Sequence, residues 1–216
     1  MFSGTGRGDH REGDPPDPVT VYGRTMADAE QLIMLRRPDA CILRISLPMG
    51  ISFNGHAGAI DWIQSRFAKQ RPATLYFDEI RTPTYTDCLN LTCHAVLARK
   101  LRGLFHAGGP RRLSLYEIAQ IINRVGGYDP RHLIGCPRWE AGPVPPRAGD
   151  VTMNSDKLAR ALGYRPFAAW PLAQRWVPTH RDWHRQRPAD EHGSPELLAT
   201  VLYRNPVLTH LPAPGF

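Results

Sequence analysis

Residues 19–48 read VTVYGRTMADAEQLIMLRRPDACILRISLP, and this stretch decides the fold class. Its first part predicts a helix, because apolar side chains that can share one helical face recur along it: Ala27, Leu32, Ile33 and Leu35. Pro38 ends that helix. Residues 40–47 then form a short apolar run, typical of a buried strand and closed by Pro48. A helix followed by a buried strand indicates an α/β protein.

The rest of the chain continues the alternation of helices and strands. Apolar spacing and capping signals predict further helices over 57–69, 87–101, 156–163 and 168–184, and one from the capping box Ser114–Glu117 to Gly126. Short strands are predicted over 74–77, 103–107 and 132–135. Loops are predicted over 1–20 and over the Pro-rich linker 143–146, and the tail from Arg187 is weakly patterned. This order of elements again favours an α/β fold.

Some side chains carry more specific predictions. Asn154 should cap the small helix that Gly163 ends. One helix should bury an apolar face made of Ile60, Ile63 and Phe67. Three tryptophans at spacings of 6 and 7 residues predict a packed helix face rather than a platform for stacked bases: Trp170, Trp176 and Trp183.

Composition excludes several classes of protein. Hydrophobic residues make up 42% of the 216 residues and charged residues 22%, which is enough to bury a core. No apolar stretch approaches the roughly 18 residues of a membrane span, and the start, MFSGTGRGDH, lacks the apolar segment of a signal peptide. The net charge of +7 fits either an anionic partner or a coding bias toward Arg. Because the cations are scattered, we favour the bias and expect no nucleic-acid partner.

The cysteines predict neither a metal site nor a disulfide framework. Their spacing contains no CxxC pair, and His94 does not complete a ligand set: Cys41, Cys88, Cys93 and Cys136. We therefore expect reduced thiols in a cytoplasmic protein without a bound metal.

The segment Tyr22-Gly-Arg-Thr-Met26 opens the first predicted helix and resembles the Tyr-x-x-x-Lys element of short-chain dehydrogenases/reductases. Residues at i and i+4 lie on one helix face. A tyrosine has an ordinary pKa near 10, and a lysine one turn later lowers that pKa and holds the cofactor ribose. The spacing therefore serves proton transfer at neutral pH.

Five stretches narrow the resemblance to the dTDP-4-dehydrorhamnose reductase (RmlD-like) family of extended short-chain dehydrogenases/reductases. They occur in the family's order and spacing, between about residues 2 and 185: GDPPDPVTVYGRT, ILRISLPMG, RTPTYTDCL, GLFHAGGPRRLSLYEIAQII and PPRAGDVTMNSDKLARALGYRP. The methionine adenosyltransferase regulatory subunit belongs to the same group and is similar in these places.

The resemblance implies an α/β fold: the C-terminal part of a Rossmann-like NAD(P)-binding fold with a small α/β substrate-binding lobe over 1–186, followed by a Pro-rich tail over 187–216. It implies reduction of the 4-keto group of a dTDP-deoxysugar, as in dTDP-rhamnose biosynthesis, with NAD(P)H as cofactor. The expected partner is a nucleotide sugar, and a homodimer is compatible with the resemblance. The alternative is a non-catalytic sugar-nucleotide- or cofactor-binding regulatory protein.

The resemblance also assigns roles to single residues, and each has a structural alternative. Tyr22 would protonate the nascent alkoxide, or simply pack at a helix entry. The residues implied in substrate binding are Arg44, Thr82, Thr84 and Arg147. For the arginines the alternative is a structural ion pair, and for the threonines a plain strand-to-helix turn. For His106, a core position is favoured over a catalytic one.

Two departures from the family pattern concern the cofactor. The position of the lysine is Met26, and Arg24 cannot replace it because it points some 200° around the helix from Tyr22. No Gly-rich turn follows an N-terminal strand, since Gly4, Gly6 and Gly8 lack a strand before them and a helix after them. We therefore expect an N-terminally truncated family member, whose start codon is internal to a longer gene and whose NAD(P)H binding is in doubt.

Overall fold

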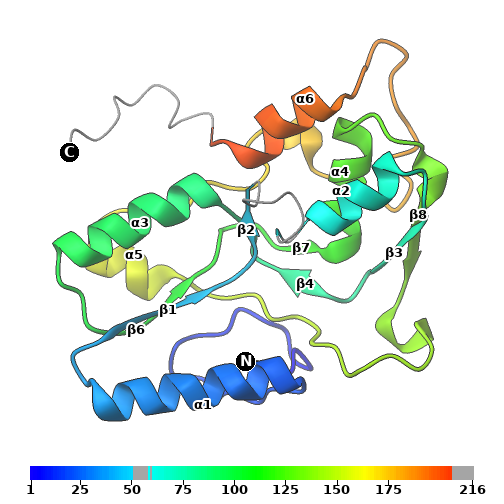
Figure 1. Cartoon of the computed structure of the whole chain (residues 1–216). Coiled ribbons are helices and arrows are strands. Elements are labelled where there is room, and N and C mark those ends of the chain that lie inside the picture. The colour runs from blue at the N-terminus through cyan, green and yellow to red at the C-terminus, as the bar shows by residue number, and fades with distance from the viewer. Residues whose placement is uncertain (51–57, 59, 206–216) are drawn as a thin grey trace.

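The quoted stretch folds into a helix and a strand, as predicted. The structure is a computed structural model that describes residues 1–50, 58 and 60–205 (Figure 1). Helix α1 (Val21–Arg36) begins after Thr20, whose hydroxyl accepts a hydrogen bond from the Gly23 amide at 2.9 Å. Strand β1 (Cys41–Ile45) follows and pairs in parallel with β6 (Gly103–Ala107).

The β1–β6 pair is the centre of one region of the molecule. Helices α3 (Thr86–Ala98) and α5 (Asp156–Leu162) lie on one side of this pair, and α1 lies on the other (Figure 1). Helix α5 ends at Gly163 with φ +73°, as predicted. The predicted cap is displaced by one residue: the helix begins after Ser155, and Asn154 Oδ1 accepts a hydrogen bond from the Asp156 amide at 2.9 Å.

A second region is built on the parallel pair β3 (Ala73–Tyr76) and β8 (Leu133–Cys136). Helices α2 (Asp61–Ala68) and α4 (Leu115–Val125) pack against it. Helix α4 has the predicted capping box, in which the Ser114 hydroxyl accepts from the Glu117 amide and the Glu117 carboxylate accepts from the Ser114 amide. The start of the predicted helix 57–69, at residues 57 and 59, lies outside the described residues.

Two short strand pairs join the regions. β2 (Pro48–Met49) pairs in parallel with β5 (Thr84–Tyr85), and β4 (Ile80–Arg81) pairs antiparallel with β7 (Leu113–Ser114). Three of the four strand pairs formed by the described residues are therefore parallel, with helices packed around them, which confirms the predicted α/β class.

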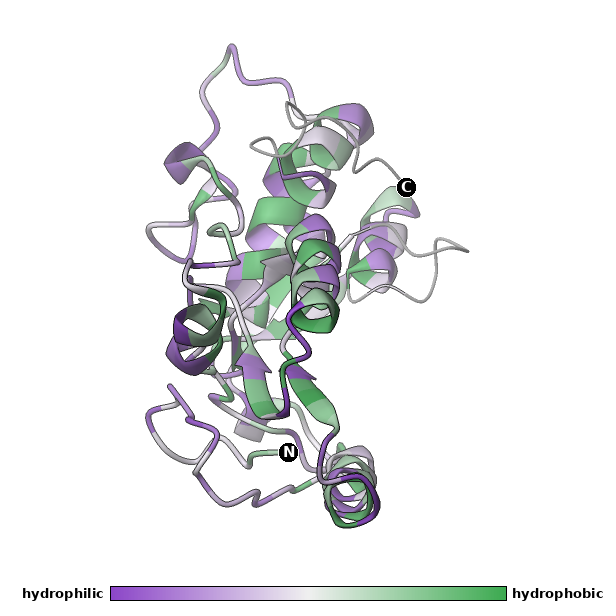
Figure 2. Ribbon diagram, turned by 90° about the vertical axis from the view of Figure 1, so that its left-hand side faces the viewer, coloured by the Kyte–Doolittle hydropathy of each residue, from purple (hydrophilic) through white to green (hydrophobic). Residues whose placement is uncertain are grey.

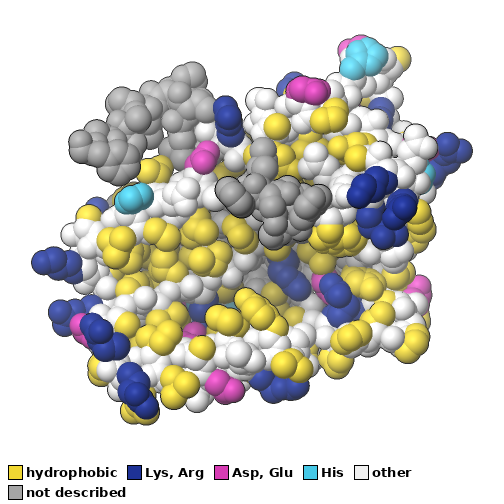
Figure 3. All heavy atoms as spheres, in the orientation of Figure 1, with side chains coloured by type: hydrophobic (Ala, Val, Ile, Leu, Met, Phe, Trp, Pro, Cys, Tyr) yellow, Lys and Arg dark blue, Asp and Glu magenta, His cyan; other side chains and the backbone are white. Residues whose placement is uncertain are grey.

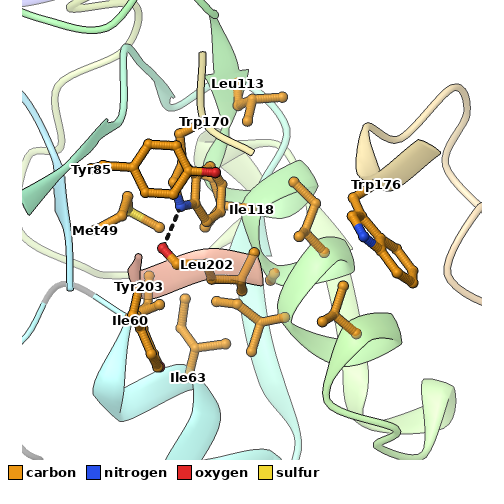
Figure 4. Packing of buried hydrophobic residues seen from close by; sticks show 14 of the residues in the cluster. Met49, Ile60, Ile63, Tyr85, Leu113, Ile118, Trp170, Trp176, Leu202 and Tyr203 are labelled. Atoms are coloured by element: carbon orange, nitrogen blue, oxygen red, sulfur yellow. Dashed lines mark hydrogen bonds between the residues drawn. The ribbon is translucent and has the colours of Figure 1, made fainter. Parts of the chain in front are cut away.

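The hydrophobic core lies between the two regions and the C-terminal segment. Figure 4 shows fully buried Tyr85 beside Trp170, whose Nε1 donates a hydrogen bond to the Leu202 carbonyl at 2.8 Å. The Tyr85 hydroxyl accepts from the Leu172 amide at 2.8 Å. The predicted apolar face of α2 is confirmed, because three side chains are at most 2% exposed: Ile60, Ile63 and Phe67.

The predicted helix over 168–184 is wrong. This segment is irregular apart from the 3-10 turn η3 (Gln174–Trp176). Pro171 and Pro178 account for the difference, because proline lacks the amide hydrogen that a helix interior needs. The three tryptophans are nonetheless buried, as expected, but from irregular backbone rather than from one helix face: Trp170, Trp176 and Trp183.

The chain after residue 187 contributes to the core. Helix α6 (Pro195–Leu198) and the π-helix η4 (Ala199–Tyr203) fold there, and the side chains of Leu198 and Leu202 are fully buried. The sequence did not predict this packing, because the few apolar residues of this short segment show no clear helical or strand period. The division of the chain at residue 186 stays a prediction. Two further 3-10 turns are η1 (Pro130–His132) and η2 (Arg138–Glu140).

Helix α1 and strand β1 are less buried than predicted. Of the predicted apolar face of α1 only Ala27 is buried, and the others are exposed: Leu32, Ile33 and Leu35. In Figure 2 α1 is seen almost end-on at the foot of the molecule, and Figure 3 shows hydrophobic side chains scattered along that lower edge. Strand β1 is mostly half-buried because, among the described residues, it has a partner strand on one edge only. No helix in the described part of the chain has the length and apolar character to cross a bilayer.

Candidate functional site

A cleft of about 600 Å³ lies between α1 and β1. One wall is the side of α1 that carries Tyr22 and Met26, and the other includes all of β1 except Cys41. The loops after β3 and before α5 close it, through Glu79 and Arg147 among others. In α/β proteins ligands bind at the carboxyl ends of parallel strands, and this cleft reaches that end of β1.

Tyr22 and Met26 lie one turn apart on the cleft side of α1, as their spacing predicts. The Tyr22 side chain is 75% exposed and its hydroxyl has no hydrogen-bond partner among the described residues. Met26 is 41% exposed and carries no charge toward the tyrosine. Arg24 is not among the residues that line the cleft, in keeping with its predicted direction.

Arg44 connects α1, β1 and β6 through a buried network. Its guanidinium donates to both carboxylate oxygens of Glu30, at 2.9 and 2.6 Å, and its Nη1 lies 3.1 Å from His106 Nε2. Burial lowers the pKa of His106, and so does the charge of Arg44. His106 is fully buried, as its core alternative predicts. Arg44 therefore already has an ion-pair partner, and its role in substrate binding stays a prediction.

Arg147 belongs to a second charged cluster, on the loops that close the cleft. It forms a two-pronged ion pair with Glu79, a side chain only 1% exposed, and its guanidinium lies 4.9 Å from the centre of the Tyr76 ring. Arg81 Nη2 lies 3.6 Å from the same carboxylate, and Arg81 Nη1 donates to the Gly149 carbonyl at 2.8 Å. The hydrogen bonds to Glu79 raise the pKa of Arg147, whereas burial lowers that of Arg81.

Glu79 and Arg81 were not among the residues that the sequence singled out. The available signal was an acidic pair, Asp78-Glu79, directly after a predicted strand. Arg147 keeps its Nη1 free of hydrogen bonds within the described residues, and it is half-exposed. A ligand phosphate can therefore reach Arg147 while Glu79 still holds its other nitrogens.

The two predicted threonines lie away from this cleft. Thr82 is buried, donates from its amide and its hydroxyl to Ser46 Oγ at 3.2 and 3.1 Å, and lines an adjacent cavity of about 260 Å³. Thr84 is fully buried on β5, and its hydroxyl has no hydrogen-bond partner among the described residues. The structure thus brings Tyr22, Arg44 and Arg147 together and leaves Thr82 and Thr84 apart.

The glycines near residue 6 pack against a distant part of the chain. Gly4 and Gly8 adopt left-handed backbone, with φ +71° and +69°, because they pack against residues 149–152. A Cβ added to Gly4 would lie 2.5 Å from the Asp150 amide nitrogen, so a larger residue at position 4 would force these two segments apart. Met26 offers a ribose only a weakly accepting thioether, and neither the charge nor the donors of a lysine. Within the described residues no group of three or more His, Cys, Asp or Glu could hold a metal ion.

Comparison with known families gives one match over most of the chain. The family model described as "RmlD substrate binding domain" matches residues 1–174. Curated relatives include methionine adenosyltransferase 2 subunit beta of Danio rerio, 26% identical over 78% of this chain and 57% of that protein. They also include dTDP-4-dehydrorhamnose reductase of Mycolicibacterium smegmatis, 25% identical over 73% of this chain and 47% of that protein. The chain thus spans about half to three-fifths of the length of these relatives.

Solved structures share the fold. The dTDP-4-dehydrorhamnose reductase of Bacillus anthracis in complex with NADP has a TM-score of 0.69 at 20% identity, covering 78% of this chain and 58% of that one. A dTDP-glucose 4,6-dehydratase of Streptomyces venezuelae has a TM-score of 0.66 at 20% identity, covering 85% of this chain and 56% of that one. These likenesses confirm the predicted Rossmann-like architecture.

Proposed function

Because the chain belongs to the RmlD substrate binding domain family, we propose that it binds a dTDP-deoxysugar in the cleft between α1 and β1. The observation that carries the proposal is the meeting of Tyr22 on α1 with the Glu79–Arg147 pair across one cleft of about 600 Å³. Such a volume is typical of small-molecule sites. The named reductases among the relatives support the ligand class.

The groups in the cleft suit a sugar joined to a diphosphate. The half-exposed Arg147 offers a free guanidinium nitrogen to a phosphate oxygen. The unpartnered hydroxyl of Tyr22 can donate to a sugar oxygen. In a family reductase that tyrosine would supply the proton as the 4-keto group is reduced. Because Met26 and the glycines do not fit NAD(P)H, we propose ligand binding without turnover by the 216-residue chain. The four free thiols support a cytoplasmic location.

Binding is tested by calorimetric titration of the chain with dTDP-rhamnose. A second titration with dTDP alone distinguishes the contribution of the nucleotide to affinity from that of the sugar. Arg147→Ala should weaken binding roughly ten- to a hundredfold, because a charge-assisted hydrogen bond is lost. Arg131→Ala is the matched control, since Arg131 is an exposed arginine paired with Asp129 outside the cleft. Absence of binding by the unchanged chain, or equal loss in both variants, would refute the proposal.

Met26 favours a second candidate, a non-catalytic regulatory protein that resembles methionine adenosyltransferase 2 subunit beta. The two candidate functions can be distinguished with a chimera that joins this chain to the dinucleotide-binding half of the M. smegmatis reductase. We expect little turnover of a dTDP-4-keto sugar with Met26, and at least about a tenfold gain with Met26→Lys, because a positioned acid–base system contributes 10²–10⁴-fold. Turnover at ordinary rates with Met26 in place would favour the enzyme.

A further inference from the structure

His106 on β6 and Arg44 on β1 share a buried hydrogen bond beside the ligand cleft. The two residues lie opposite each other in the register of this strand pair, and Arg44 is only 7% exposed while His106 is fully buried. His106 Nε2 lies 3.1 Å from Arg44 Nη1. A guanidinium group can only donate hydrogen bonds, so this ring nitrogen is the acceptor and carries no proton.

The second ring nitrogen of His106 contacts the N-terminal loop. Its Nδ1 lies 2.9 Å from the carbonyl oxygen of His10, which can only accept, so Nδ1 carries the ring proton. The His106 amide donates to Glu12 Oε1 at 2.8 Å, which joins the same loop to β6. Both ring nitrogens are thus engaged, and these contacts admit only the neutral imidazole that is protonated at Nδ1.

Arg44 connects His106 to α1. Its Nε and Nη2 donate to the two carboxylate oxygens of Glu30, at 2.9 and 2.6 Å. Among the residues that the structure describes, these are the only hydrogen bonds that join α1 to another helix or strand. We call the chain of contacts from α1 to the N-terminal loop the histidine latch: Glu30, Arg44, His106 and His10.

We propose that His106 is a positioning residue, which holds Arg44, and through it α1, in the place that the ligand cleft requires. A proton on Nε2 would turn this acceptor into a cationic donor that faces the guanidinium. The hydrogen bond would then be replaced by repulsion between two buried like charges. Arg44 and Glu30 would move away from β6, and α1, the cleft wall that carries Tyr22, would move with them. The neutral imidazole closes the latch, and the imidazolium opens it.

The groups around His106 set the pH at which the latch opens. Burial is the largest influence and lowers the pKa of His106 below its ordinary 6.5. The Glu12 carboxylate, from the loop, opposes this effect, whereas the cation of Arg44 and the His10 ring reinforce it. On α1, the Glu30 carboxylate is bound by Arg44. Because the pKa of the folded state is lowered, the latch is closed above that pKa and opens as the pH falls through it.

Hydrogen–deuterium exchange of α1 tests the latch without any ligand. After correction for the intrinsic pH dependence of exchange, we expect the protection of α1 to fall about three- to tenfold between about pH 7.5 and about pH 5. His106→Gln should abolish this fall, because its amide offers an acceptor to Arg44 and a donor to His10 but takes up no proton. His184→Asn, which replaces a fully buried histidine outside the latch, is the matched control and should keep the fall.

Ligand affinity gives a second readout, and this part of the inference rests on the proposed function. The diphosphate of dTDP-rhamnose stays fully ionised over the same pH range. In calorimetry its affinity should fall with pH by at most about tenfold per unit, because one proton must leave His106 before the site forms. His106→Gln should bind as the unchanged chain does at about pH 7.5, and nearly independently of pH. His106→Leu, which offers Arg44 no acceptor, should bind about tenfold more weakly throughout.

The two readouts distinguish the latch from the ligand. Protection of α1 that does not change with pH, or that falls equally in the unchanged chain and in His106→Gln, would overturn the latch. Ligand affinity that is the same at both pH values, although the protection of α1 falls, would overturn the positioning role. A fall in protection that depends on His106, in a chain that binds no dTDP-rhamnose at any pH, would support the latch and count against the proposed function alone.

Discussion

Some side chains of the candidate site could be predicted from the sequence and others could not. The i, i+4 spacing of Tyr22 and Met26 follows from helix geometry alone, and the structure places both on the cleft wall. Glu79 could not be found in this way. Its importance depends on meeting Arg147, 68 residues further along the chain, and no local pattern encodes that contact.

A buried histidine makes stability depend on pH. His184 is fully buried, and its Nδ1 lies 3.1 Å from the Gln120 amide nitrogen. Burial first, and then the nearby charge of Arg185, lower its pKa to about 4 from an ordinary 6.5. The unfolded chain therefore binds a proton between these values while the folded chain does not. Stability is fully present above pH 6.5 and falls by about 1.4 kcal/mol per pH unit down to about pH 4.

Melting temperatures between pH 7 and pH 4 check this behaviour. We expect a steady fall for the unchanged chain and a shallower fall for His184→Asn, which has no proton to take up. His192→Asn serves as control because His192 is exposed. Identical slopes for the unchanged chain and His184→Asn would show that other groups cause the pH dependence.

Helix ends can be predicted from the sequence where neighbouring residues determine them. The capping box of α4 and the left-handed Gly163 after α5 were both predictable, because the residues that form them are neighbours. The segment 168–184 was not, since apolar spacing suggested a helix while Pro171 and Pro178 prevented one. Its tryptophans are placed by tertiary packing, as the bond from Trp170 to Leu202 illustrates.

Gly109, just after β6, lies where a larger side chain should destabilise the fold. A Cβ added to Gly109 would lie 2.0 Å from the Pro83 carbonyl oxygen, which belongs to the loop between β4 and β5. Gly109→Ala should therefore force these segments apart and lower the unfolding free energy by about 1–3 kcal/mol. Gly6→Ala is the control, because nothing lies within 4 Å of its added Cβ. Chemical denaturation compares them, and equal stability of the two variants would contradict the packing.

For the molecule as a whole, the main question is whether the chain binds NADH or NADPH. The sequence predicted an α/β protein without a Gly-rich dinucleotide turn, and in the described residues Gly4 and Gly8 pack against the chain instead. We therefore expect no measurable binding of NADH or NADPH to the 216-residue chain in a fluorescence titration. The pyrophosphate would lack an anchor. Micromolar affinity would refute this expectation and show a dinucleotide site elsewhere in the chain.

The loop that contains residues 9 and 10 can complete its contacts only late in synthesis of the chain. His10 forms a parallel bridge with Met153, and the Asp9 amide donates to the Thr152 hydroxyl, across 143 residues of sequence. At roughly 5–20 residues per second of synthesis, the loop waits about 7–30 s for its partners to leave the ribosome. During that interval residues 9 and 10 lack the partners that hold them in the finished fold. Until then the loop of the nascent chain is open to chaperones and proteases.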